Sequence, residues 1–70
     1  MSTVLAAVNR TLDRLERDPY EPRLGSRAFV TEEYGGVSAT PARVDTWYVL
    51  WTPGIDERSI EIILVHAFDL

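Results

Sequence analysis

The fold of this chain is decided by its last third, where residues 47–68 have the sequence WYVLWTPGIDERSIEIILVHAF. Two runs rich in aromatic and β-branched residues, Trp47–Thr52 and Ile60–Phe68, predict two strands. Residues 53–59 between them begin with Pro-Gly, which is typical of a hairpin loop, and Asp45-Thr46 predicts a tight turn before the first strand. The first strand is expected to be central because of its aromatic and β-branched composition. The second is expected to be central because both of its faces are apolar in the middle.

Side-chain alternation along these strands assigns residues to faces of the sheet. On the first strand, one face carries Trp47, Val49 and Trp51. Tyr48 lies on the opposite face. On the second strand, the even-numbered residues from Ile60 to Phe68 share one face. Two tryptophans on one face could stack nucleic-acid bases, although a small core more often uses them to gain buried area.

Apolar residues near the N-terminus recur at spacings of three and four, the periodicity of an amphipathic helix. They are Val4, Leu5, Val8, Leu12 and Leu15. Ser2 and Thr3 can cap the N-terminus of this helix. Pro19 ends it, because proline disfavours the α region at the residue before it. A helix from about Thr3 to Arg17 is therefore predicted.

The middle of the chain predicts a loop and two shorter strands. Residues 18–26 contain two prolines and a glycine without periodicity, which indicates a connecting loop. Arg27–Glu32 alternates and predicts a short strand, and Gly35-Gly36 supplies a turn. Val37–Val44 contains Pro41, which cannot donate to a sheet ladder, so an irregular or edge strand is expected there.

Length and composition predict one α+β domain over residues 1–70: an N-terminal amphipathic helix packed on an antiparallel sheet of three or four strands. The 70 residues include no cysteine, so disulfides and thiolate metal sites are excluded, and no metal or cofactor is expected. No apolar run approaches the roughly 18 residues of a membrane span, and the N-terminus has no signal-peptide pattern. A cytoplasmic protein without membrane association is the expectation.

Charge argues against a general attraction to nucleic acid, because 11 acidic and 7 basic residues give a net charge of −4. Every basic side chain is an arginine and none is a lysine. This reflects either a GC-rich genome or selection of the guanidinium group, which pairs bidentately with phosphate or carboxylate.

Five residues are candidates for a functional site. His66 could act as a general acid or base, although a half-buried histidine bonded to the backbone is the commoner role. Arg43 precedes the tryptophan-rich strand, and Arg23 and Arg27 border the loop before the sheet. With His66 they would form a cationic patch for phosphate or an acidic protein segment; separate solvated arginines are the alternative. The hydroxyl of Tyr48 must find water or a partner, which adds it to Arg23 and Arg27 as a candidate binding residue.

Three short phrases resemble the RelE/ParE superfamily of bacterial toxin–antitoxin toxins. The helix end and exit at residues 12–20 are similar to the family's "L…DP" phrase. Arg43–Trp51 (RVDTWYVLW) is similar position by position to its "RVGDYRVIY", and Ile62–Phe68 (IILVHAF) resembles its "V…HR" ending. The resemblance covers the chain from about Leu12 onward and implies a helical region followed by a curved antiparallel sheet.

The resemblance implies one of two activities. RelE-like members are endoribonucleases that cleave messenger RNA on the ribosome, whereas ParE-like members act on DNA gyrase, and an antitoxin that wraps over the toxin neutralises both. By alignment, Arg43 would contact phosphate and His66 would be the C-terminal catalytic or positioning histidine. Tyr48 stands where the family phrase has its second arginine, which argues against efficient RNA cleavage. The alternative is a non-enzymatic interaction module, such as a homodimer that buries an uncovered sheet face.

Overall fold

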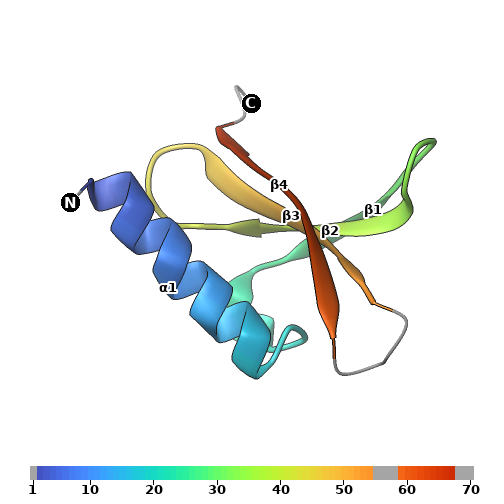
Figure 1. Ribbon diagram of the computed structural model, residues 1–70, viewed down its shortest axis with the longest axis horizontal. Coiled ribbons are helices and arrows are strands. Elements are labelled where there is room, and N and C mark those ends of the chain that lie inside the picture. The colour runs from blue at the N-terminus through green and yellow to red at the C-terminus, as the bar shows by residue number, and fades with distance from the viewer. Residues whose placement is uncertain (1, 55–58, 68–70) are drawn as a thin grey trace.

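One helix lies across one face of a four-stranded antiparallel sheet (Figure 1). The structure is a computed structural model, and it describes residues 2–54 and 59–67. Its elements are α1 (Thr3–Arg17), the short 3-10 helix η1 (Pro22–Leu24), β1 (Arg27–Thr31), β2 (Gly35–Pro41), β3 (Trp47–Pro53) and β4 (Ile60–Ala67). The strands follow chain order in the sheet, β1-β2-β3-β4. The predicted α+β class is confirmed.

Helix α1 has the predicted bounds. It ends because Asp18 is extended (φ −158°, ψ 97°) before Pro19. Ser2 occupies the N-cap position, but its side chain makes no capping hydrogen bond. The buried face is formed by Ala7, Val8, Thr11 and Leu15. Leu5 was expected on this face and is instead 51% exposed, because it lies about a quarter of a turn from the centre of the stripe.

The turns agree with the sequence in one case and differ in the other. Asp45 and Thr46 form the predicted turn between β2 and β3, closed by Trp47 N–H donating to Val44 O at 3.2 Å. The β1–β2 turn is formed by residues 32–34, not by the glycine pair, and Gly35 (φ 71°) is already the first residue of β2. Strand β1 ends at Thr31, one residue earlier than predicted.

Strand β2 is interior, so the expectation of an irregular or edge strand was wrong. It pairs with β1 on one side and with β3 on the other. Pro41 is compatible with this position because it is the last residue of the strand, paired with Tyr48, where the ladder ends. The inward face of β2 carries polar residues, Ser38 and Thr40, in register with Trp51 and Val49.

A buried hydroxyl in the core accounts for that polar face. Trp51 Nε1 donates to Thr40 Oγ1 at 2.9 Å, and Ser26 Oγ lies 2.6 Å from the same oxygen. Thr40 is 0% exposed and Trp51 only 1%. Tyr20 adds an edge-to-face contact with Trp51, with ring centroids 6.0 Å apart. Trp51 therefore serves packing, not base stacking, and Trp47 packs against the same core.

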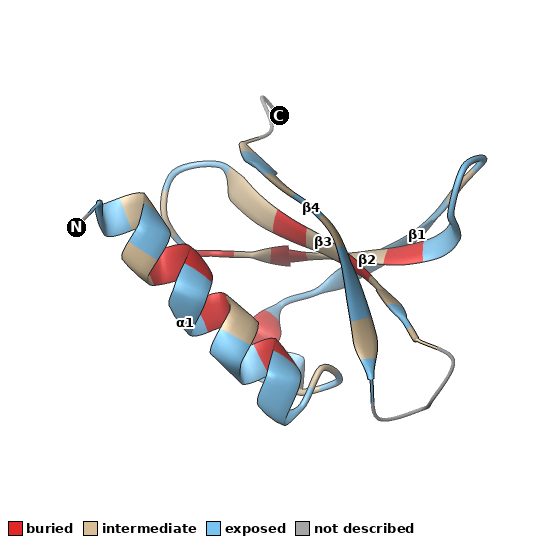
Figure 2. Ribbon diagram, in the orientation of Figure 1, coloured by how far each residue is buried: buried red, intermediate tan, exposed pale blue. Residues whose placement is uncertain are grey.

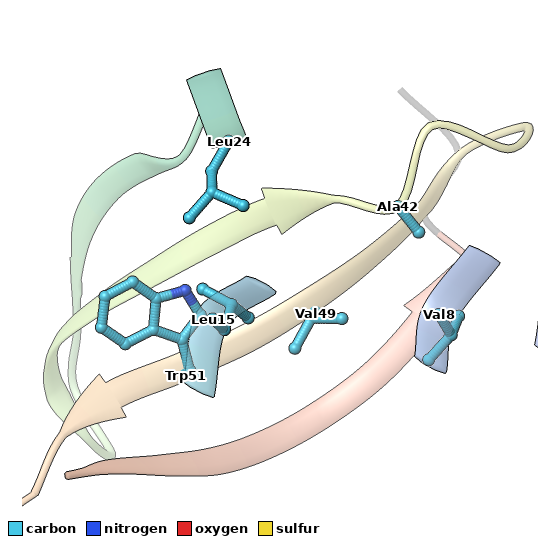
Figure 3. Packing of buried hydrophobic residues seen from close by; sticks show 6 residues of the cluster. All are labelled: Val8, Leu15, Leu24, Ala42, Val49 and Trp51. Carbon is cyan, nitrogen blue, oxygen red and sulfur yellow. The ribbon is translucent and has the colours of Figure 1, made fainter. Parts of the chain in front are cut away.

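The apolar core lies between α1 and the sheet. Figure 3 shows its buried members, Val8, Leu15, Leu24, Ala42, Val49 and Trp51. Leu24 comes from η1, inside the segment predicted as a loop without structure, and it is only 2% exposed. Gly25 follows η1 in the left-handed region (φ 69°) and turns the chain toward β1.

Strand β4 is an edge strand, so the expectation that it is central was wrong. It pairs only with β3 in the described sheet, and a β-bulge shifts the register: Leu50 pairs with Leu64, but Trp51 pairs with Ile62. The bulge puts Ile60 and Val65 on the same face, and both pack against the core. The even-numbered residues therefore do not share one face. Phe68 and loop residues 55–58, also part of these predictions, lie outside the described residues.

We expect Thr40→Val to destabilise the fold, because it leaves the indole N–H of Trp51 buried without an acceptor. The expected loss is about 1–3 kcal/mol of unfolding free energy, and each kcal/mol lowers Tm by roughly 4–8 °C in a domain of this size. Thr52→Val is the matched control. Its hydroxyl donates to Gly36 O at 2.9 Å in a half-exposed position, where water replaces the lost bond. Equal losses in urea unfolding of the two variants would contradict the proposed role of Thr40.

Candidate functional site

The sheet has an outer face, the side opposite α1 (Figure 2). Cross-strand partners share a face, and one row crosses all four strands: Arg27, Ala39, Leu50 and Leu64. Beside it on the same face lie Phe29, Tyr48 and His66, and also Val37, the cross-strand partner of Phe29, which is buried (2% exposed). We call these eight residues the outer face. Phe29 and Leu64 are each 42% exposed, and Leu50 and Tyr48 are half-buried. No helix in the described ranges covers this surface.

The outer face brings together two of the five predicted site residues. Tyr48 and His66 are direct cross-strand partners near one end of the β3–β4 hairpin, which places a phenol beside an imidazole. Tyr48 is half-buried, whereas His66 is exposed. Arg27 lies on the same face but on β1, two strands from Tyr48 and three from His66, which corresponds to about 10 Å and about 14 Å across the sheet.

The other two predicted residues meet in the loops at the β2–β3 end. Arg43 has a positive φ (66°), and its Nη2 atom donates to the backbone oxygen of Arg23 at 3.1 Å. The contact uses the Arg23 carbonyl and not its guanidinium group. The predicted neighbourhood of Arg43 and Arg23 therefore exists, although as a structural hydrogen bond that holds the β2–β3 loop against η1.

Arg43 also belongs to a group that the sequence did not indicate. With Arg10 and Arg14 of α1, it lines a shallow cavity of about 230 Å³ between the helix and the β2–β3 loop. Arg14 is paired with Glu21, with 3.1 Å between Nη2 and Oε2. Arg10 and Arg14 lie four residues apart on one helix side, which was visible in the sequence. Their proximity to Arg43 depends on how the loop docks and has no local signal.

The expected cationic patch of Arg23, Arg27, Arg43 and His66 is therefore not assembled: Arg43 bonds to Arg23 at the β2–β3 loop, whereas Arg27 and His66 lie on the outer face. Arg43 lines a cavity on the α1 side of the sheet, whereas His66 lies on the outer face. A phosphoryl-transfer site needs its cation and its general acid within hydrogen-bond reach of one phosphate. Within the described residues, Arg43 lines one cavity with Arg10 and Arg14, and His66 is the cross-strand partner of Tyr48.

The described residues contain neither a metal site nor a membrane-spanning helix. Among them, no group of three or more His, Asp or Glu side chains is placed to hold a metal ion. In the same ranges, no helix is both long enough and apolar enough to cross a bilayer. Comparison of the chain with protein-family models, curated proteins and solved structures found no match.

We expect Gly25→Ala to cost more stability than Gly35→Ala. Both glycines have nearly the same positive φ, 69° and 71°, so the backbone penalty of about 1–2 kcal/mol is shared. Only at Gly25 would the new Cβ lie close to another group, 2.9 Å from Nη2 of Arg43, which must then leave the Arg23 carbonyl. The extra cost should be up to about 1 kcal/mol.

Urea unfolding of both variants, alone and combined with Arg43→Ala, separates the two contributions. In the Arg43→Ala background the two glycine substitutions should have equal effects. A Gly25→Ala penalty that persists in that background would show that Arg43 does not hold this loop.

Proposed function

We propose that this chain is a toxin-like component of a bacterial toxin–antitoxin system that acts by binding a protein target, in the manner of a gyrase-directed toxin. An antitoxin segment would neutralise it by covering the outer face. Such a component acts in the cytoplasm. The observation that carries the proposal is the outer face itself, a sheet surface with exposed Phe29 and Leu64 around half-buried Leu50 and Tyr48. The likeness to the RelE/ParE phrases supplies the functional class.

The composition of the outer face suits a polypeptide partner. Aromatic residues and arginine are enriched at protein interfaces, where they act as anchors with a polar rim around them. Here Phe29 and Tyr48 are the aromatic groups, and Arg27 and His66 lie toward opposite edges. An acidic or mixed-charge antitoxin segment crossing the strands would bury the apolar row and meet a basic side chain at each side.

Binding is favoured over RNA cleavage for three reasons. Arg43 and His66 belong to different groups, on the α1 side and on the outer face. Tyr48 replaces the second arginine of the family phrase, which removes a cation that would stabilise the transition state. The net charge of −4 opposes the counterion release that drives binding to RNA.

The test is inducible expression with parallel pulse-labelling of protein and DNA synthesis. We expect growth arrest in which DNA synthesis falls first and which His66→Ala leaves unchanged. Arrest in which translation falls first, and which His66→Ala abolishes, would replace the binding mechanism with ribonuclease activity. Absence of arrest would remove the toxin assignment and leave the alternative, a non-enzymatic interaction module.

Two adjacent residues of β1 test the antitoxin surface. Phe29→Glu places a charge on the outer face, whereas Val30→Glu changes an 84% exposed side chain on the other face of the same strand. We expect Phe29→Glu to weaken binding of the cognate antitoxin by at least about tenfold. Val30→Glu should leave the affinity unchanged in isothermal titration. Equal effects of both substitutions would contradict an interface on the outer face.

A further inference from the structure

Strand β4 presents an unusually open edge. It is the longest strand, with eight residues, and on its far side no described strand pairs with it. Soluble proteins protect such edges with proline, lysine, short length, an inward-pointing charge or a β-bulge that twists the edge away. The sequence of β4, IEIILVHA, has neither proline nor lysine, and Ile62 and Leu64 are 43% and 42% exposed. A strand of this kind is suited to pairing with another strand.

The β-bulge gives β4 an uncommon arrangement of faces. Through their partners on β3, residues Ile60, Ile62, Val65 and Ala67 lie on the α1 side, and Glu61, Leu64 and His66 lie on the outer side. In a regular strand, residues an odd number of positions apart lie on opposite faces. Here Glu61 and His66 are five positions apart and share a face, because the extra residue Ile63 lies between them.

We propose that β4 pairs antiparallel with β4 of a second copy of this chain, with a two-fold axis between Ile63 and Leu64. The pairing places Ile60 opposite Ala67, Glu61 opposite His66, and Ile62 opposite Val65 of the second copy. Each of these pairs joins two residues of the same face, so the α1 sides and the outer sides of both sheets are continuous. The result is one eight-stranded sheet with an isologous interface.

This register is selected because directly opposed residues of two antiparallel strands must lie on the same face of the sheet. A shift by one residue would set Ile62 against His66 and Glu61 against Ala67, which joins α1-side residues to outer-side residues. The selected register also separates the two Glu61 carboxylates and places each opposite an imidazole, a favourable cross-strand pair. Without the bulge, the eight-residue strand β4 could not pair with itself about this axis and keep its faces matched.

The surface beside the edge adds apolar area on the α1 side. An open groove there is lined by Leu12, Leu15 and Glu16 of α1 and by Ser59, Ile60 and Ile62. Since Leu15 is 0% exposed, Leu12, Ile60 and Ile62 supply its apolar surface. In the proposed register, Val65 and Ala67 of the second copy lie next to Ile62 and Ile60, at the rim of that groove. The outer face, which carries the proposed antitoxin surface, remains uncovered in this dimer. Of its residues only Leu64 and His66 lie on the paired strand, where His66 is opposite Glu61 of the second copy. The inference therefore stands independently of the proposed function.

Disulfide trapping in the intact chain tests the register directly, because the native sequence contains no cysteine. Directly opposed antiparallel residues have Cα atoms about 4.5–5.5 Å apart, within the range of a disulfide. We expect Glu61→Cys/His66→Cys to form a covalent dimer on oxidation. Either single variant, and the shifted pair Glu61→Cys/Ala67→Cys, should remain largely uncrosslinked. Preferential crosslinking of the shifted pair would overturn the proposed register.

Sedimentation analysis of the native sequence and two lysine variants tests the edge independently of cysteine chemistry. We expect a concentration-dependent dimer whose dissociation constant rises at least about tenfold in Ile62→Lys. It should stay unchanged in Val30→Lys, which changes an exposed residue of the opposite edge strand, and in Phe29→Glu. Two outcomes would overturn the proposal. One is a chain that is still monomeric at a protein concentration of about 100 μM, and the other is a dimer that is disrupted by Phe29→Glu alone.

Discussion

The hydrogen bond from the Trp51 indole to the Thr40 hydroxyl is the constraint on which the rest of this sheet depends. A domain this small gains much of its buried area from one tryptophan, but the indole N–H must then find an acceptor inside the core. Thr40 supplies it from the neighbouring strand, and Ser26 joins the same oxygen from the residue before β1. The network therefore couples β2, β3 and the residue before β1, and it fixes which face of β2 points toward α1.

Fixing that face also creates the candidate site. Since Thr40 points inward, its neighbours Ala39 and Pro41 point outward, in register with Leu50 and Tyr48. The outer face is the direct consequence: the row Arg27, Ala39, Leu50 and Leu64 is not covered by any helix in the described ranges. Helix α1 packs on one side of the sheet, and the residues that a partner would contact on the other side are set by an interaction beneath the helix.

Local sequence was sufficient for α1, for β3 and for the turn at Asp45, because periodicity and turn chemistry act over a few residues. It failed for the positions of strands within the sheet. Pro41 suggested an edge, yet it lies at the end of an interior strand where its missing N–H has no effect on the ladder. Leu24 was missed because one apolar residue in a proline-rich loop has no period, and it is buried only through η1.

In the candidate site, too, features set by local sequence were predictable and features set by tertiary packing were not. The pairing of Tyr48 with His66 follows from two strands predicted correctly and joined as a hairpin, whereas the cavity formed by Arg10, Arg14 and Arg43 depends on helix docking. Tertiary placement of this kind is not encoded in any short window. It explains why the proximity of Arg23, Arg27, Arg43 and His66, expected as one cationic patch, could not be settled from the sequence.

The prediction that β4 is a central strand failed because of its β-bulge. Apolar residues at both even and odd positions of a strand usually indicate burial on both faces. A bulge produces the same sequence pattern in an edge strand, because after the extra residue the odd positions, not the even ones, lie on the α1 side. The sequence IEIILVHA contains both halves of that exchange, with Ile60 and Ile62 before the bulge and Val65 and Ala67 after it. A bulge at an edge normally interrupts pairing with other chains. Here it lies near the middle of the strand, where a two-fold axis can pass, so the feature that usually protects an edge makes this one complementary to itself.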